Sequence, residues 1–392
     1  MADQQYTHPD VTPKVLLKQL NDDALYQKLT GKHTTPIMIW GQPGIGKSQL
    51  IRQVGKNTNR PVIDIRLLLK DPTEIGGLPY FDPQTNDMKY ARPSDLPDAN
   101  GPFKDAIILM DELSSAPMSV QAAALGLVLE RRINDYELPK GVMMVAAGNR
   151  SGDGTVHNSM PMPLRNRFHH VNLVHNTEDW LEWGMFAGLA TEVQSFIKAH
   201  PDKLNVFDAK KLRGVYSFAT PRSWEFVSEE IVKYNFLKSK GADISVSDLY
   251  RRIGSLVGQD MRTMFKAHFE EAQKLPDPFD VVHGRVKKAS IDKTSMKYAC
   301  SLQVAYALRE TIQTRFSEAE NGGKAFEECD DEYNQYIDNA LGFMYHNIDE
   351  KDINVATFWM LTSKEYGIDV NSAKITDELL DDPDFAKFLQ AI

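Results

Sequence analysis

Five short apolar segments recur between residues 36 and 175, separated by longer stretches with the periodicity of amphipathic helices. These segments are 36–40, 62–66, 106–110, 142–147 and 170–174. The first, third and fourth are almost wholly apolar, as strands covered on both faces must be. Alternation of such strands with helices is typical of a parallel sheet, so the pattern predicts an α/β domain.

Two polar insertions interrupt this alternation. The span 76–102 is rich in glycine and proline and is too long for an ordinary connection in such a sheet. It predicts an inserted hairpin or a functional loop. A shorter polar stretch, 134–141, follows the helix-like segment 120–132 and precedes the fourth strand.

The strand signal ends near residue 176, and helical periods follow, with breaks at Pro201, Pro221 and 276–278. The sequence therefore predicts an α/β domain first and helices afterwards. The predicted boundaries are 1–175 for the α/β domain, 176–275 for a helical domain and 276–392 for a helical C-terminal extension.

Composition narrows the class of protein further. A chain of 392 residues is long enough for two or three domains. It has 45 basic and 54 acidic residues, a net charge of −9, which disfavours indiscriminate nucleic-acid binding. No apolar run approaches the ~20 residues that span a bilayer. Neither a secretory signal nor a paired-cysteine motif is visible around Cys300 and Cys329, so we expect a cytoplasmic protein.

A phosphate-binding motif follows the first predicted strand. Residues 41–48 read GQPGIGKS and match G-x-x-x-x-G-K-[ST] in full. In such a loop successive backbone N–H groups surround the β- and γ-phosphates, Lys47 adds a positive charge, and Ser48 offers a hydroxyl to Mg²⁺. A flexible glycine loop is the alternative, which the position between strand and helix disfavours. The predicted nucleotide-binding residues are Gly41, Gln42, Pro43, Gly44, Ile45, Gly46, Lys47, Ser48 and Gln49.

Polar residues at the ends of two further strands complete a candidate catalytic site. Asp111 can hold Mg²⁺ opposite Ser48, and Glu112 can orient and deprotonate an attacking water. Asn149 ends the fourth strand and can fix that water or touch the γ-phosphate. The alternatives are acidic strand ends that serve solubility and an asparagine that caps a turn.

Two arginines lack an evident local partner. Arg167 ends a helix-like stretch before the last strand, either as an exposed basic turn or as an arginine presented to a neighbouring subunit's phosphate. Thr220 and Pro221 predict a helix start, where the positive charge of Arg222 opposes the helix dipole. Arg222 is therefore explained better if it faces an anion such as a nucleotide phosphate.

Taken together, these motifs resemble those of an AAA+ ATPase, closest to the MoxR-type branch. The segments 71–79 (DPTEIGGLP) and 111–116 (DELSSA) are similar to that branch as well. The resemblance covers roughly residues 10–265. It implies that 41–48 is Walker A, Asp111 and Glu112 are Walker B, Asn149 is sensor 1, Arg167 is the arginine finger and Arg222 is sensor 2. It also implies that 76–102 is a helix-2 insert, 134–141 a later hairpin insert and 176–275 a lid.

The same resemblance implies a Mg²⁺-dependent ATPase that forms a homo-oligomeric ring, commonly of six subunits. Such rings remodel or mature protein clients, often with a partner that bears a von Willebrand factor A domain. Two alternatives stay open. One is a nucleic-acid motor or restriction-type translocase subunit, and the other is a nucleotide switch that barely turns over, against which the intact Glu112 weighs.

Three other groups of residues have simpler interpretations than a functional site. The spacing of the histidines fits no zinc motif, so a catalytic metal there is disfavoured. The basic cluster 285–288 can contact nucleic acid or solvate a helix. The acidic clusters near 327–331 and 381–382 can form a docking tail or a solvated face. The histidines considered are His157, His169, His170 and His175.

Overall fold

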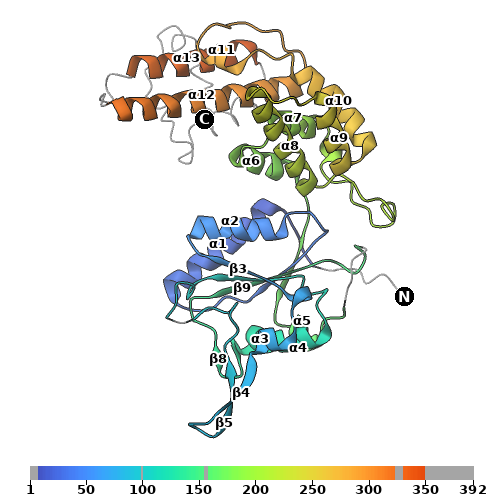
Figure 1. The fold of residues 1–392 in the computed structure, drawn as a ribbon, viewed down its shortest axis with the longest axis vertical. Coiled ribbons are helices and arrows are strands. Elements are labelled where there is room, and N and C mark those ends of the chain that lie inside the picture. The colour runs from blue at the N-terminus through green and yellow to red at the C-terminus, as the bar shows by residue number, and fades with distance from the viewer. Residues whose placement is uncertain (1–7, 99, 154–157, 323–329, 349–392) are drawn as a thin grey trace. The chain divides into compact units, whose positions relative to one another are not determined.

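The computed structural model describes residues 8–98, 100–153, 158–322 and 330–348. The chain forms two compact units (Figure 1). The first comprises the residues up to Trp180 together with Asn205–Arg222, and the second comprises Leu181–Leu204 together with the residues from Ser223 onward. Each unit is therefore built from two separate segments of the chain.

The first unit contains a six-stranded sheet in the order β1-β10-β2-β9-β6-β3, in which every neighbouring pair is parallel. The five predicted strands are confirmed within a residue or so of their expected bounds. The sixth strand, β1, was not predicted, because its two residues are too few to form a recognisable apolar pattern. The strands are β1 (Asp10–Val11), β2 (Ile37–Trp40), β3 (Val62–Arg66), β6 (Ile107–Asp111), β9 (Met143–Gly148) and β10 (His169–Leu173).

Helices cover both faces of this sheet, which explains why β2, β6 and β9 are almost wholly apolar. Ile107 and Leu109 pack in one core cluster with α1 (Pro13–Thr30) and α2 (Lys47–Thr58). Ile108 and Met110, which alternate with them along β6, pack in a second cluster. The helices of that second cluster are α4 (Met118–Glu130) and α5 (Met162–Arg165). The predicted parallel α/β domain, with helices after it, is confirmed.

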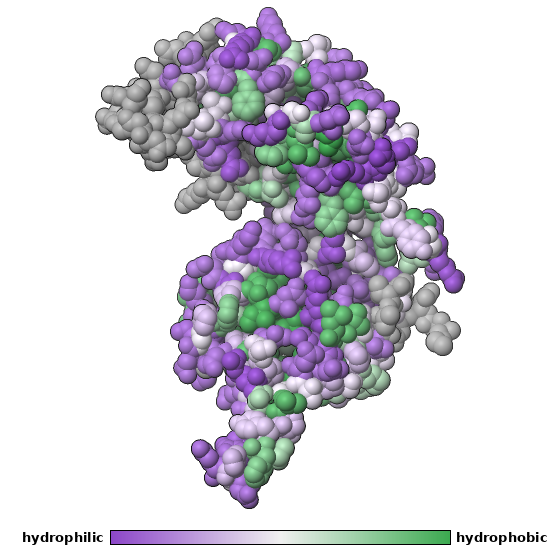
Figure 2. All heavy atoms as spheres, in the orientation of Figure 1, coloured by the Kyte–Doolittle hydropathy of each residue, from purple (hydrophilic) through white to green (hydrophobic). Residues whose placement is uncertain are grey.

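Both predicted insertions contain antiparallel hairpins. After η1 (Leu67–Leu69) and α3 (Pro72–Gly76), β4 (Leu78–Asp82) pairs with β5 (Asp87–Ala91). The second hairpin begins two residues before the predicted insertion 134–141, because α4 ends at Glu130 rather than at 132, and there β7 (Arg132–Ile133) pairs with β8 (Tyr136–Glu137). The first hairpin exposes five large apolar side chains by 39% to 64%, and Figure 2 shows green spheres along it. These five are Leu78, Tyr80, Phe81, Met88 and Tyr90.

The second half of the chain is helical, and the prolines at 201, 221 and 278 each begin a helical element. Phe196, Trp224 and Phe265 form the aromatic centre of its core, with ring centroids 5.2 to 5.7 Å apart. In the part of the chain that the structure describes, no helix is long and apolar enough to cross a membrane. The elements are α6 (Thr177–Ala187), α7 (Thr191–Ala199), η2 (Pro201–Lys203), α8 (Pro221–Ser239), α9 (Val246–Val257), α10 (Gln259–Ala272), α11 (Pro278–Val282), α12 (Thr294–Gly322) and α13 (Asp330–Asn347). His157 and the acidic clusters at 327–328 and 381–382 lie outside the described residues.

Candidate active site

The glycine-rich motif forms the connection from β2 to α2, as the sequence predicts. Gly46 has φ +100°, a conformation that favours glycine, and it directly precedes the first residue of α2, Lys47. The N–H of Gly41 donates to the carbonyl of Gly148 at the end of β9 (3.2 Å). The loop is therefore anchored at the carboxyl edge of the sheet, with the amino end of a helix beside it, where an anion is favoured.

Lys47 is buried, and its ammonium group makes three hydrogen bonds to other residues of the site. Its Nζ donates to the carbonyls of Gly41 (2.7 Å) and Gln42 (3.1 Å) and to Oδ1 of Asn149 (2.8 Å). Burial lowers the pKa of Lys47 to about 8, and the nearby carboxylate of Asp111 offsets only part of this effect. The structure thus brings together Lys47 and Asn149, two of the predicted site residues, although they are far apart in the sequence. The negative charge of a bound phosphate would raise the pKa of Lys47 again.

Ser48 and Asp111 form the second contact of the site. The Ser48 hydroxyl donates to Oδ2 of Asp111 at 2.8 Å, and Oδ1 of Asp111 accepts from the backbone N–H of Glu112 at 2.9 Å. A hydroxyl and a carboxylate are oxygen donors of the kind that Mg²⁺ prefers. The predicted pair therefore fits a magnesium ion in chemistry and in position.

Glu112 has a left-handed backbone, with φ +57°. Its carbonyl accepts from the N–H groups of Ser115 (2.9 Å) and Ala116 (3.1 Å), and the N–H of Leu113 donates to the carbonyl of Ala147 (3.0 Å). Such a conformation costs about 1 to 3 kcal/mol in a residue with a side chain and persists only where neighbouring contacts enforce it. Residue 112 therefore leaves the strand direction at the carboxyl edge of the sheet, in a turn that the surrounding hydrogen bonds fix.

Ser114 is a site residue that sequence reasoning missed. Its fully buried hydroxyl donates to the backbone carbonyl of Asn149 and accepts from the N–H of the same residue, both at 3.1 Å. A Cβ on Gly148 would lie 2.6 Å from this hydroxyl oxygen, so the approach requires glycine there. The sequence shows only two adjacent serines between apolar residues. This pattern does not indicate that Ser114 bonds to Asn149, which follows a different strand.

Residues 205–222, which we call the strap, return from the helical unit to the phosphate-binding loop. Nδ2 of Asn205 donates to Oε1 of Gln42 (2.9 Å), and the N–H of Arg222 donates to the carbonyl of Gly44 (3.3 Å). A backbone bond between the two ends of the strap, from Val206 to Ala219, closes its base. The charge of Arg222 contributes to lowering the pKa of Lys47, so the predicted Arg222 lies near the phosphate site of its own chain.

Arg167 lies away from these residues. In the parallel pairing of β10 with β2, His169 faces Ile37, so Arg167 precedes the amino end of β10. The phosphate-binding loop follows the carboxyl end of β2, and a strand of this length spans roughly 15 Å. Arg167 is exposed, and within the described part of the chain its guanidinium forms no ion pair. The structure therefore does not bring Arg167 to the loop of its own chain.

Of the histidines considered in the sequence, His170 and His175 have separate partners. His170 accepts a hydrogen bond from Nε1 of Trp40 (2.9 Å), while Nδ1 of His175 lies 3.4 Å from Nδ2 of Asn205. Within the described ranges, no group of three or more histidine, cysteine, aspartate or glutamate residues is placed to hold a metal ion.

One family model matches the part of the chain that carries this geometry. Residues 37–176 match the ATPase family associated with various cellular activities (AAA). Residues 37–176 form an AAA domain. AAA domains belong to the P-loop ATPases. The chain is therefore an enzyme that binds and hydrolyses ATP.

Solved structures of RuvB from Thermotoga maritima are distantly similar to between 68% and 83% of this chain. The RuvB Holliday junction branch migration motor is 15% identical over 68% of this chain and 73% of that chain, with a TM-score of 0.34. A point mutant of the same protein is 14% identical over 83% and 86% of the two chains, with a TM-score of 0.35. Likenesses this distant do not identify what the AAA domain of this chain acts on.

Proposed function

We propose that this chain is a MoxR-like ATPase of the cytoplasm that hydrolyses MgATP in a six-membered ring and thereby remodels or matures protein clients. The observation that carries the catalytic part is the contact of Ser48 with Asp111, next to the contact of Lys47 with Asn149. We also retain, as a proposal, the functional division into an ATP-binding domain at 1–175, a lid at 176–275 and a helical extension at 276–392.

Each polar residue of the site has a task in this proposal. Lys47 and the backbone of the loop bind the phosphates. Ser48 and Asp111 would hold Mg²⁺, whose charge would neutralise phosphate oxygens. Glu112 accepts the proton of the attacking water, and Asn149 orients that water.

The two arginines divide between subunits. Arg222 senses nucleotide from within its own chain, which its position beside Gly44 and Lys47 supports. Arg167 completes the site of a neighbouring subunit, which its exposure at the opposite edge of the sheet supports. A ring supplies each site with such a neighbour.

A protein client is favoured by the β4–β5 hairpin. Five large apolar side chains are exposed on this one short hairpin. Clustered exposed apolar side chains are typical of a surface that binds a protein partner. The MoxR resemblance adds, as a proposal, a partner with a von Willebrand factor A domain.

The test of the proposed chemistry compares three variants. Lys47→Ala should abolish ATP binding, whereas Glu112→Gln should bind ATP and lose hydrolysis, because only the second spares the phosphate contacts. Glu130→Gln, on an exposed glutamate at the end of α4, is the matched control and should hydrolyse ATP normally. Hydrolysis by Glu112→Gln at the wild-type rate would show that Glu112 is not the base. Proteins retained by ATP-bound Glu112→Gln in a cell extract would identify the client.

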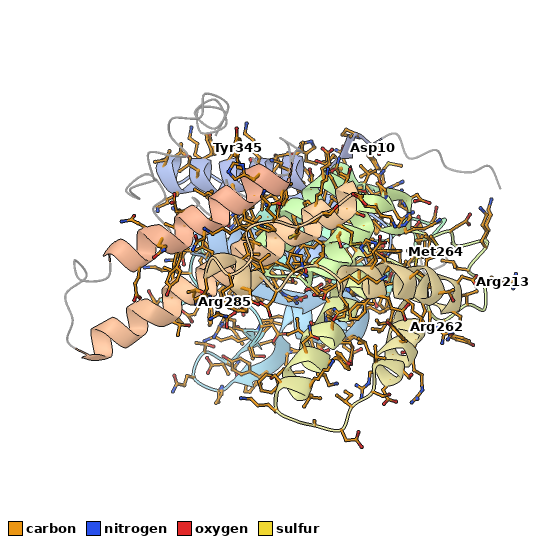
Figure 3. All side chains as sticks on the ribbon, turned by 90° about the horizontal axis from the view of Figure 1, so that it is seen from above. Asp10, Arg213, Arg262, Met264, Arg285 and Tyr345 are labelled. Carbon is orange, nitrogen blue, oxygen red and sulfur yellow. The ribbon has the colours of Figure 1, made fainter. Side chains whose placement is uncertain are left out.

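A nucleic-acid motor is the second candidate, favoured by the tip of the strap. Tyr216 is 96% exposed there, and Lys210, Lys211 and Arg213 are exposed nearby. Arg213 lies clear of the helices and strands in Figure 3. Cations beside an exposed aromatic ring suit single-stranded nucleic acid. Stimulation of hydrolysis by oligonucleotides, with a steep dependence on salt, would favour this candidate over a protein client.

A further inference from the structure

The helical unit contains a cleft of ≈ 730 Å³ that has no part in the ATPase site. It opens between the start of α7, the middle of α8, the turn after α10 and the middle of α12. Its volume falls within the range of ≈ 300 to 1,000 Å³ that is usual for ligand sites. The lining residues used below are Thr191, Glu192, Val232, Phe279, Gln303 and Glu310.

Glu192, in the first turn of α7, is a buried acidic residue that lines this cleft. The residue is only 6% exposed, and burial raises the pKa of its side chain. The Thr191 hydroxyl donates to Oε2 of Glu192 (3.4 Å), and Nε2 of Gln303 donates to the Thr191 hydroxyl oxygen (3.1 Å). Gln303 thus donates to Thr191 and Thr191 donates to Glu192, and these two hydrogen bonds hold the Glu192 side chain in place.

No cation of the described residues forms an ion pair with Glu192. Arg309 also lines the cleft, but it does not pair with this carboxylate. Ionising a buried carboxyl without a positive partner is costly, so burial raises the pKa of Glu192, and a cation that enters the cleft would offset part of that cost.

The mouth of the cleft has a different character. Val232 on α8 is 54% exposed and Phe279 on α11 is 39% exposed, so two large apolar side chains border the opening. Glu310 on α12 adds an exposed second carboxylate. A ligand that complements the cleft therefore carries a positive charge on a long apolar stem, with apolar groups on either side.

We propose that this cleft binds a lysine-containing segment of a partner protein, with the lysine ammonium on Glu192 and the flanking apolar side chains on Val232 and Phe279. A lysine stem is apolar along four methylene groups and ends in a compact charge, which matches an apolar mouth above a buried carboxylate. The proposal goes beyond ATP hydrolysis, because every lining residue belongs to the helical unit.

The test uses the full chain and a fluorescein-labelled heptapeptide with one lysine between leucines. Anisotropy should show that replacing the lysine by acetyl-lysine weakens binding at least tenfold, because acetylation removes the charge. Glu192→Gln, which keeps the shape of the side chain, should bind the two peptides equally. Glu310→Gln, at the exposed carboxylate, should keep most of the preference. ATP hydrolysis should be unchanged in Glu192→Gln, which separates this site from the catalytic proposal.

A second variant keeps the test decisive if Glu192→Gln folds poorly by circular dichroism. Val232→Lys changes an exposed rim position, and its added charge should weaken the lysine peptide at least tenfold. Equal binding of the lysine and acetyl-lysine peptides to the wild type would overturn the proposal. So would full discrimination by folded Glu192→Gln, or n-butylamine competing as strongly as the peptide, since a free amine would then suffice.

Discussion

Replacing Ser114 by alanine should slow ATP hydrolysis while leaving nucleotide binding almost intact. The Ser114 hydroxyl makes two hydrogen bonds of 3.1 Å to the backbone of Asn149, and alanine removes both. At about 0.5 to 1.5 kcal/mol each, the loss comes to about 1 to 3 kcal/mol. If Asn149 must keep this position in the transition state, the same free energy lowers kcat about 5- to 150-fold. Lys47 still has the carbonyls of Gly41 and Gln42, so KM for ATP should change less than about threefold.

The assay is steady-state hydrolysis at saturating and limiting ATP, paired with thermal denaturation of the same variants. Ser228→Ala is the matched control, since its buried hydroxyl accepts from the N–H of Ala190 (2.7 Å) in the helical unit. It should lose stability without losing kcat. If Ser114→Ala is destabilised but hydrolyses at the wild-type kcat, the serine is only a structural support and the argument for positioning Asn149 fails.

Three further predictions concern other parts of the chain. Mixing Arg167→Ala with Lys47→Ala protomers should restore part of the hydrolysis, whereas the same mixture with Arg222→Ala should not; equal recovery in both mixtures would contradict a role for Arg167 across the subunit interface. Deleting residues 80–90 should leave ATP binding intact and reduce client retention in pull-downs; loss of the folded state would show that the hairpin is structural. Burial lowers the pKa of His268 from 6.5 to about 4, so only the unfolded chain binds the proton between these pH values. The helical unit should therefore lose roughly 3 kcal/mol of stability as the pH falls from 6.5 to 4, and thermal melts of His268→Gln should lack most of this slope.

Features that depend on local sequence could be predicted, and features that depend on packing between distant segments could not. The apolar run that ends at Asp111 and the motif around Lys47 each carry their own signal, because burial on both faces and phosphate binding restrict neighbouring residues directly. The contact of Ser114 with Asn149 depends instead on how the turn after β6 lies against β9. The left-handed turn at Glu112 is enforced by the same neighbours, and glutamate gives no hint of it.

Glu192 shows the same limit in the helical unit. Its sequence context is an ordinary first helical turn, where an acidic residue is favoured by the helix dipole and is usually solvated. Only the packing of α12 and α10 against α7 turns a common surface residue into a buried one.

The return of the strap to the first unit also constrains how the protein is made. The ribosome has finished all six strands by residue 173, yet the contacts of Asn205 and Arg222 with the phosphate-binding loop cannot form until the strap has been synthesised. By then Leu181–Leu204, which belongs to the other unit, has been synthesised. It must stay unpacked at that stage, because most of the helices it packs with have not yet been made. The first unit therefore cannot complete the contacts of its phosphate-binding loop by folding strictly from the N-terminus. If Arg222 senses nucleotide as proposed, a fragment that ends at residue 180 should contain the sheet but bind ATP poorly.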